Sequence, residues 1–60
     1  MAKPSIRCGL TADGNIEAAI DISKRLVIDP QSGNVIQSTV REGTDAFRYL
    51  VTEARKWRVQ

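Results

Sequence analysis

The 60-residue chain has no histidine and a single cysteine, Cys8. Cys8 has no second thiol with which to form an internal disulfide, and a zinc site would need ligands that the sequence lacks. Histidine is also the side chain whose unperturbed pKa lies nearest neutrality, so most general acid–base and nucleophile-activating arrangements are missing. A chain this short can hardly enclose a substrate pocket of about 300 Å3 or more without giving up its core. We therefore expect no enzymatic activity, no metal, no cofactor and no small-molecule substrate.

Long apolar segments are also absent, because no apolar run reaches even ten residues. No charged segment followed by an apolar one marks a leader at the start of the chain. A transmembrane helix needs about 20 apolar residues, and a secretory signal needs an apolar region behind a basic one. The sequence therefore predicts a cytoplasmic protein with no membrane partner.

Charge is nearly balanced, with nine basic and seven acidic residues and a net charge of +2. Residues 1–30 hold four of each sign, whereas residues 31–60 hold five basic and three acidic residues and carry the whole excess. This weak positive field belongs to the C-terminal half. It is far from the dense basic clusters of a dedicated nucleic-acid-binding arm.

Alternating apolar residues indicate strands in the first half of the chain. Residues 5–12, "SIRCGLTA", predict a strand, and "DGN" at residues 13–15 predicts a three-residue hairpin loop. From Ile16 to Ile28 the even positions stay apolar except at Lys24, which favours one long bent strand. The alternative breaks this segment at "SKR", where no Gly, Pro, Asn or Asp is present to make the turn.

Matching apolar with apolar residues selects a register for these first two strands. It sets Leu10 opposite Ala18, Cys8 opposite Ile20, Ile6 opposite Ile22, and Arg7 against Asp21 on the outer face.

The second half predicts one more strand and a helix. Residues 34–41, "NVIQSTVR", form the strand, with Ile36, Ser38 and Val40 directed inward. Thr44 is a good helix N-cap, and the period then changes to that of an α-helix. Its apolar stripe consists of Phe47, Leu50, Val51, Ala54 and Trp57.

These elements predict an α+β fold, a three-stranded antiparallel β-sheet meander covered on one face by a single C-terminal α-helix. The sheet gains a fourth strand if residues 16–28 break in two. Residues 1–4 are expected to be a flexible N-terminus, and residues 5–60 a single small β-β-β-α domain. The predicted core is Ile6, Cys8, Leu10, Ile16, Ile20, Ile22, Leu26, Ile28, Ile36, Val40, Phe47, Leu50, Val51, Ala54 and Trp57.

The segment "VIDPQSGNVI", residues 27–36, predicts a hairpin turn. Asp29 can bond its own turn, Pro30 fixes a turn backbone angle, and Gly33 accepts a positive φ. The segment lacks the alternating oxygen ligands and closing glutamate of a calcium loop, and the Lys-Ser or Lys-Thr and following helix of a phosphate loop. This interpretation places Ile28 near Ile36 on the buried face.

Candidate binding residues lie on the outer faces of the helix and of the sheet. The candidates on the helix are Arg48, Tyr49, Thr52, Arg55, Lys56 and Trp57. The tyrosine, the tryptophan and the arginines among them are residue types that anchor interfaces. Trp57 is either a lid on the core or a partner anchor. The alternative sheet-face set is Arg7, Arg25, Gln37, Thr39 and Arg41, with Glu17 and Asp21 among them. Those two carboxylates would repel phosphates, which disfavours DNA docking on the sheet. Cys8 is expected to act as a small core hydrophobe.

Two family resemblances follow from this layout. The order strand, strand, "DPQSG" turn, strand, helix resembles the N-terminal arm-binding domains of phage integrases, which implies DNA contact through the exposed sheet at positions that include Glu17, Ala19 and Asp21. Separately, "LVIDPQSGNVIQ" followed by a helix is similar to the C-terminal hairpin and helix of FlaG-type flagellar proteins, over about half of the chain.

Two functions remain open at the level of the sequence. The first is a protein-binding or self-associating module, acting as a regulator or inhibitor of a larger partner or forming a homodimer. A marginal 60-residue fold gains from burying an edge strand or an open face. The second is nucleic-acid binding, with Arg48, Arg55, Lys56 and Arg58 of the helix on phosphates.

Overall fold

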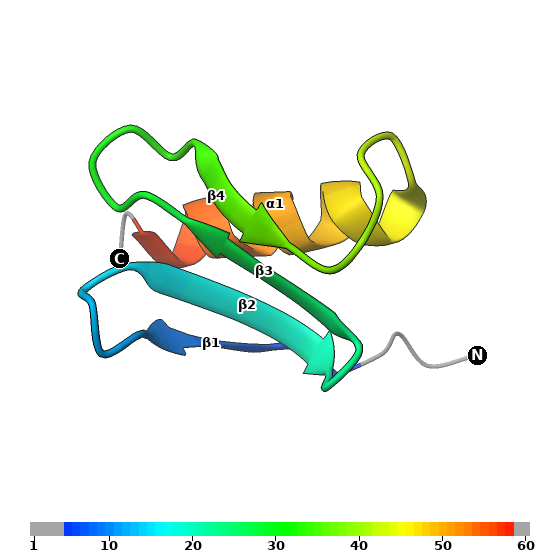
Figure 1. Cartoon of the computed structure of the whole chain (residues 1–60), viewed down its shortest axis with the longest axis horizontal. Helices are drawn as coiled ribbons and strands as arrows, with labels where there is room; N and C mark the ends of the chain where they lie inside the picture. Colours follow the sequence, from blue (N-terminus) through cyan, green and yellow to red (C-terminus); the bar gives the residue numbers. More distant parts are fainter. Residues whose placement is uncertain (1–4, 59–60) are drawn as a thin grey trace.

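Four antiparallel strands and one helix make up the computed structural model, which describes residues 5–58. The elements are β1 (Arg7–Leu10), β2 (Ile16–Asp21), β3 (Lys24–Ile28), β4 (Val35–Ser38) and α1 (Asp45–Arg58). The strands follow one another across the sheet in the order β1-β2-β3-β4, and α1 packs on one face (Figure 1). The predicted α+β fold is confirmed, in its four-stranded form. The expected flexible N-terminus at residues 1–4 lies outside the described residues, and the single domain over 5–60 stays a prediction.

The long bent strand predicted for residues 16–28 is wrong, because a tight turn at Ile22 and Ser23 separates β2 from β3. The Asp21 carboxylate makes this turn by accepting hydrogen bonds from the Ser23 amide, at 2.8 Å, and the Ser23 hydroxyl, at 2.6 Å. Neither turn residue has a positive φ, so the turn types that usually join two strands this tightly are excluded. A bulge between Ala19 and Asp21 supplies the twist instead.

The predicted register of the first two strands is wrong by two residues. Cys8 pairs with Ala18 rather than Ile20, and Arg7 pairs with Ala19 rather than facing Asp21. The reason lies in the loop, which Thr11 and Asn15 close through the Thr11 amide and the Asn15 carbonyl, 2.8 Å apart. The three-residue loop is therefore 12–14 rather than 13–15, with Gly14 in the left-handed conformation (φ 86°) that such a loop needs at its last position. The other two predicted pairs, Leu10 with Ala18 and Ile6 with Ile22, fail for the same reason.

The hairpin turn predicted at residues 27–36 is confirmed. Asp29 accepts hydrogen bonds from the amides of Gln31 and Gly33, both at 2.8 Å, and Gly33 has a φ of 77°. The predicted proximity of Ile28 and Ile36 is wrong, because a second bulge makes Val35 the partner of Ile28.

The core lies between α1 and strands β2 and β3. Thr44 caps the helix as predicted, its hydroxyl accepting the Phe47 amide at 3.2 Å. Six residues form the buried cluster, Ile16, Ala18, Leu26, Ile28, Leu50 and Ala54, and eight pack around it, Ile6, Cys8, Ile20, Val35, Val40, Phe47, Val51 and Trp57.

Three predicted core residues are exposed instead, namely Leu10 (68%), Ile22 (92%) and Ile36 (55%). Leu10 lies at the end of an edge strand, Ile22 in the turn that the single-strand interpretation missed, and Ile36 at the second bulge. Within residues 5–58, no helix is long and apolar enough to cross a membrane.

Candidate functional site

A groove of about 330 Å3 runs between β4 and α1. Its apolar lining comes from one strand residue, Val35, and two helix residues, Phe47 and Val51. The polar lining comes from α1 alone, through Arg48, Thr52 and Arg55. We call these six residues the β4–α1 groove.

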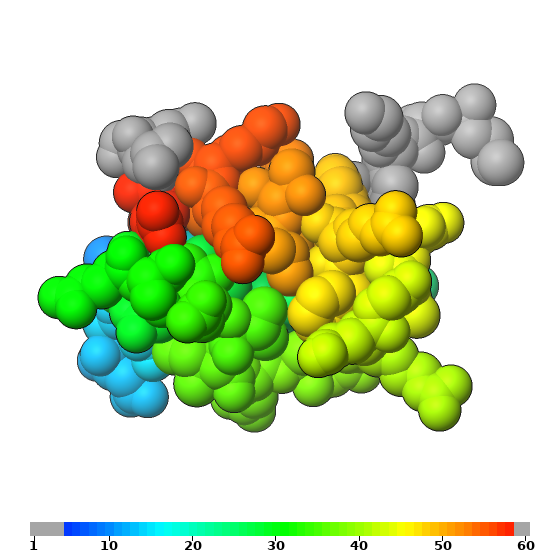
Figure 2. Space-filling view, turned by 90° about the horizontal axis from the view of Figure 1, so that it is seen from above, coloured from blue at the N-terminus to red at the C-terminus, as the bar shows by residue number. Residues whose placement is uncertain are grey.

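The groove exists because one helix is too narrow for a four-stranded sheet. Neighbouring strands lie about 4.8 Å apart, so the outer strands are about 14 Å apart, whereas a helix with side chains is about 10 Å wide. The packing of α1 falls on β2 and β3, with a smaller contact to β1. Seen from above, the green β4 hairpin lies beside the yellow-to-red helix (Figure 2). Val35 consequently stays only partly buried, as do Phe47 and Val51.

The charge in the groove is positive. Arg48 and Arg55 are both exposed, and no Asp or Glu lines the groove. The Arg48 guanidinium has no hydrogen bond or ion pair to any of residues 5–58. An apolar floor beside two guanidinium groups that have no carboxylate partner within residues 5–58 suits a partner that offers apolar side chains next to carboxylates.

Arg55 also ties the β3–β4 hairpin to the end of α1 by a hydrogen bond, and the Arg58 guanidinium lies close to the same glycine, Gly33. The Arg55 Nε donates a hydrogen bond to the Gly33 carbonyl oxygen at 3.0 Å. Gly33 is buried, and a Cβ at this position would meet the Arg58 guanidinium. Of the four basic residues predicted to bind phosphates, Arg55 is therefore bonded to the hairpin and Arg58 lies against it. Arg55 has five N–H donors and uses only one of them here, so it can still bind a partner.

The remaining helix residues predicted to bind a partner do not line the groove. Lys56 bonds the Glu53 carboxylate at 3.3 Å, one helical turn away. Trp57 packs against the core, as the lid interpretation predicted, and Tyr49 is partly buried. Of the six predicted helix residues, the fold therefore brings Arg48, Thr52 and Arg55 together in the groove.

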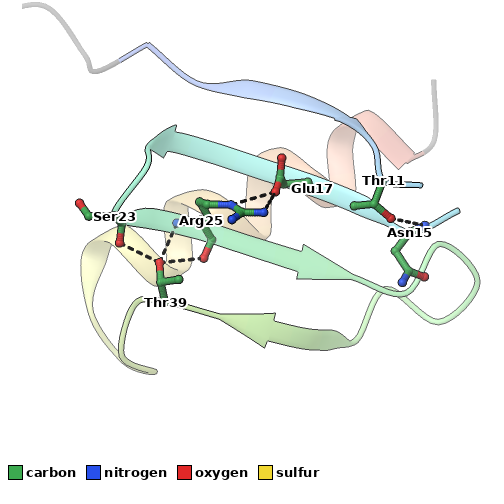
Figure 3. Close-up of polar contacts among 6 residues, drawn as sticks. All are labelled: Thr11, Asn15, Glu17, Ser23, Arg25 and Thr39. Atoms are coloured by element: carbon green, nitrogen blue, oxygen red, sulfur yellow. Dashed lines mark hydrogen bonds and ion pairs between the residues drawn. The ribbon is translucent and has the colours of Figure 1, made fainter. Parts of the chain in front are cut away.

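The outer sheet face uses part of its predicted binding set to hold itself together (Figure 3). The Arg25 guanidinium forms an ion pair with the Glu17 carboxylate, with its Nε 2.9 Å from Oε2. The Thr39 hydroxyl donates to the Ser23 carbonyl at 2.8 Å and accepts the Arg25 amide at 2.9 Å. Arg25 thus links β3 to β2, and Thr39 links the end of β4 to the start of β3.

The other three predicted sheet-face residues do not form one surface. Arg7 lies on β1 and Gln37 on β4, at opposite edges of the sheet, and Arg41 lies beyond β4 in the connection to the helix. A shallow hollow of about 470 Å3 does open near Arg7 and Arg25, over Ala19, but the Glu17 and Asp21 carboxylates line it too. The mixed charge gives this face no clear preference for a partner.

Cys8 is a partly buried residue beside the core. Burial, followed by the nearby Glu53 carboxylate, raises the pKa of the Cys8 thiol above its ordinary value. The thiol is therefore predominantly protonated at neutral pH and a poor nucleophile. Within the described residues 5–58, no cluster of three His, Cys, Asp or Glu side chains is arranged to hold a metal ion.

No protein-family model, no curated protein and no solved structure matches this chain. The four strands also differ from the three-stranded sheet of the integrase arm-binding domains that the sequence layout resembles.

Sequence reasoning found the polar half of the groove and missed the apolar half. The helix stripe places Phe47 and Val51 in the core, and both do pack against it while also lining the groove. Val35 is not singled out by the sequence, because the alternation of the last strand directs Ile36 inward. A four-stranded sheet paired with one 14-residue helix was the signal that could have revealed an uncovered strand.

Proposed function

We propose that this chain is a small non-enzymatic protein-binding module that engages its partner through the β4–α1 groove. The observation that carries the proposal is the groove lining, in which Val35, Phe47 and Val51 remain partly exposed beside Arg48. The Arg48 guanidinium has no partner within residues 5–58. Apolar side chains flanked by arginine are typical of the centre of protein interfaces. No pair of titratable groups suited to acid–base catalysis lines this groove.

Nucleic-acid binding through the helix is the alternative, and the contacts of α1 favour it less. Lys56 is paired with Glu53, while Arg55 and Arg58 lie against the hairpin at Gly33. Phosphate contacts by these side chains would have to compete with those interactions. Arg48 alone stands free of them, and a single phosphate contact gives little affinity.

The proposal is tested by affinity capture from a nuclease-treated extract of the cells that naturally make the protein. The baits are the wild type and two variants, Arg48→Glu in the groove and Arg7→Glu on β1, at the opposite edge of the sheet. Both side chains are exposed, and both substitutions change the net charge equally. We expect one protein to be retained in stoichiometric amount by the wild type and by Arg7→Glu, and to be lost with Arg48→Glu.

Three results would overturn the proposal. Loss with Arg7→Glu alone would move the binding surface to the sheet. Retention of no protein by any bait would end the protein-binding account. The nucleic-acid alternative would be established by two results together. Material would be retained only when nuclease is omitted, and binding of the chain to mixed DNA and RNA would fall steeply with salt.

A further inference from the structure

We infer that the occupant of the β4–α1 groove is an amphipathic helix of another protein, which carries two acidic residues seven positions apart on its docking face. This inference rests on the proposed function and specifies the partner of the same surface. The partner helix would lie beside α1, over β4, the strand that α1 covers least.

The width of the uncovered surface favours a helix. About 14 Å of sheet accommodates one helix with space left for part of a second, and helices pack side by side at 8–10 Å. The partly exposed apolar side chains come from both walls, Val35 on the strand and Phe47 and Val51 on α1. A helix lying along the groove would contact both walls at once.

Strand addition to β4 is the other common way to use such an edge, and the bulge at Ile36 opposes it. An added strand needs a regular row of free amides and carbonyls, whereas a bulge interrupts that row and twists the edge away. β4 is only four residues long and contains the bulge within it. Only a short stretch of regular edge remains for an incoming strand.

The positions of the arginines specify the charge pattern of the partner. Arg48 and Arg55 are seven residues apart on α1, which is two turns or about 10.5 Å along its axis. Val51 lies between them along the helix. A helix that packs alongside α1 matches this surface with two carboxylates seven residues apart and apolar residues three and four positions after the first.

The same spacing argues against a second copy of this chain as the occupant. The midpoint between Arg48 and Arg55 along α1 lies between Val51 and Thr52. In a two-fold antiparallel contact, Arg48 of each copy would therefore lie beside Arg55 of the other. Like charges in such a contact oppose association, whereas carboxylates from a different protein favour it.

The test titrates the ¹⁵N-labelled full chain with two designed alanine-rich helical peptides of identical composition. The first carries two glutamates seven residues apart, with leucines three and four positions after the first glutamate. The second carries the same leucines but has both glutamates moved to the opposite helix face. We expect the first peptide to shift the amide resonances of Val35, Phe47 and Val51, and to bind about tenfold more tightly than the second, since two exposed ion pairs are lost in the second.

Charge reversal at one position provides the matched control. Arg48→Glu should weaken binding of the first peptide about tenfold, and replacing one of its two glutamates by lysine should restore that loss. Arg7→Glu, with the same net charge, should leave the affinity unchanged. Position 48 is exposed and helical, and glutamate is a good helix former near a helix N-terminus, so the variant retains the fold.

Equal affinity for the two peptides, or resonance shifts confined to outer-face residues such as Glu17 and Gln37, would overturn the inference. A captured partner that depends on Arg48, combined with no binding of either peptide, would overturn the helical partner while leaving the protein-binding function in place. If no partner is captured and neither peptide binds, both the helical partner and the protein-binding function are overturned.

Discussion

At the scale of single residues, the structure depends on a few positions where the backbone conformation or the burial restricts which residue types are tolerated. Gly33 combines a positive φ with a buried site under the arginines of α1, and Ile28 is completely buried in the core. Equally apolar residues in the turn and at the bulge, Ile22 and Ile36, are exposed. The identity of a residue therefore says less than its place in the register.

Gly33→Ala is expected to destabilise the protein by more than Gly43→Ala. Both glycines have a positive φ, which costs about 1–2 kcal/mol for alanine. Gly43 faces open space, whereas a methyl at Gly33 also displaces the Arg58 guanidinium. Urea unfolding of both variants measures the difference. In an Arg58→Ala background the Gly33→Ala cost should fall towards that of Gly43→Ala, and an unchanged difference would contradict the packing described here.

Removal of one methyl group distinguishes the observed register from the expected one. Ile28→Val should lower the free energy of unfolding by about 1 kcal/mol, because it leaves a small cavity in the core. Ile22→Val should change it by less than about 0.5 kcal/mol, because Ile22 is in solvent. The two values come from the same denaturant titration. Similar losses at both positions would mean that Ile22 is buried.

At the scale of elements, the helix was predictable, whereas the register of the first hairpin and the presence of the second were not. The stripe of α1 repeats over several turns and Thr44 marks its start, so one periodic signal defines the element. The β2–β3 turn depends on the Asp21 side chain and on a bulge beside it. Neither interrupts the apolar alternation that suggested a single strand.

The β1–β2 register and the apolar wall of the β4–α1 groove could not be predicted from the sequence for a related reason. The β1–β2 register is set by Thr11 and Asn15, through hydrogen bonds that apolar matching ignores. The polar residues of the groove lie on one helix face and were therefore found. Its apolar wall depends on which strand α1 leaves uncovered, which is a property of the assembled layers.

The β2–β3 turn gives a prediction of pH dependence. Hydrogen bonds from the Ser23 hydroxyl, and then from the Ser23 amide, lower the pKa of Asp21. A carboxylate with a lowered folded pKa stabilises the fold above its unfolded pKa of about 3.9, and this stabilisation is lost as the pH falls through the folded value. The stability advantage of the wild type over Asp21→Asn should therefore shrink below about pH 4.

Chemical unfolding between about pH 2 and pH 7 measures this advantage. Ser23→Ala serves as a second variant, because it removes the hydroxyl donor while keeping the Asp21 charge. It should reduce the pH-dependent part of the advantage without removing it. Parallel stability curves for the wild type and Asp21→Asn would show that the carboxylate does not hold this turn.

At the scale of the whole molecule, one helix on a four-stranded sheet leaves the fold open on the side of β4. The opposite side is closed more completely, since α1 also reaches β1. The β4–α1 groove combines two arginines of the positively charged C-terminal half with three partly exposed apolar side chains. We regard this combination as the reason that a partner would bind there.

The charge arrangement leads to a prediction about oligomeric state. The wild type should sediment as a monomer at high concentration, because association through the groove brings Arg48 and Arg55 of two copies together. Arg48→Glu should associate more strongly, since each copy then offers opposite charges at these two positions. Arg7→Glu has the same net charge and should behave as the wild type does. A wild-type dimer that Arg48→Glu weakens would contradict this arrangement.

The most direct test of the proposed function is site-specific photo-crosslinking in the cells that naturally make the protein. A benzophenone side chain replaces Thr52, in the groove, or Gln37, which is exposed on β4 but does not line the groove. We predict a discrete adduct with a different protein from position 52 and none from position 37. Equal adducts from both positions, or an adduct from position 37 alone, would contradict a binding surface between β4 and α1.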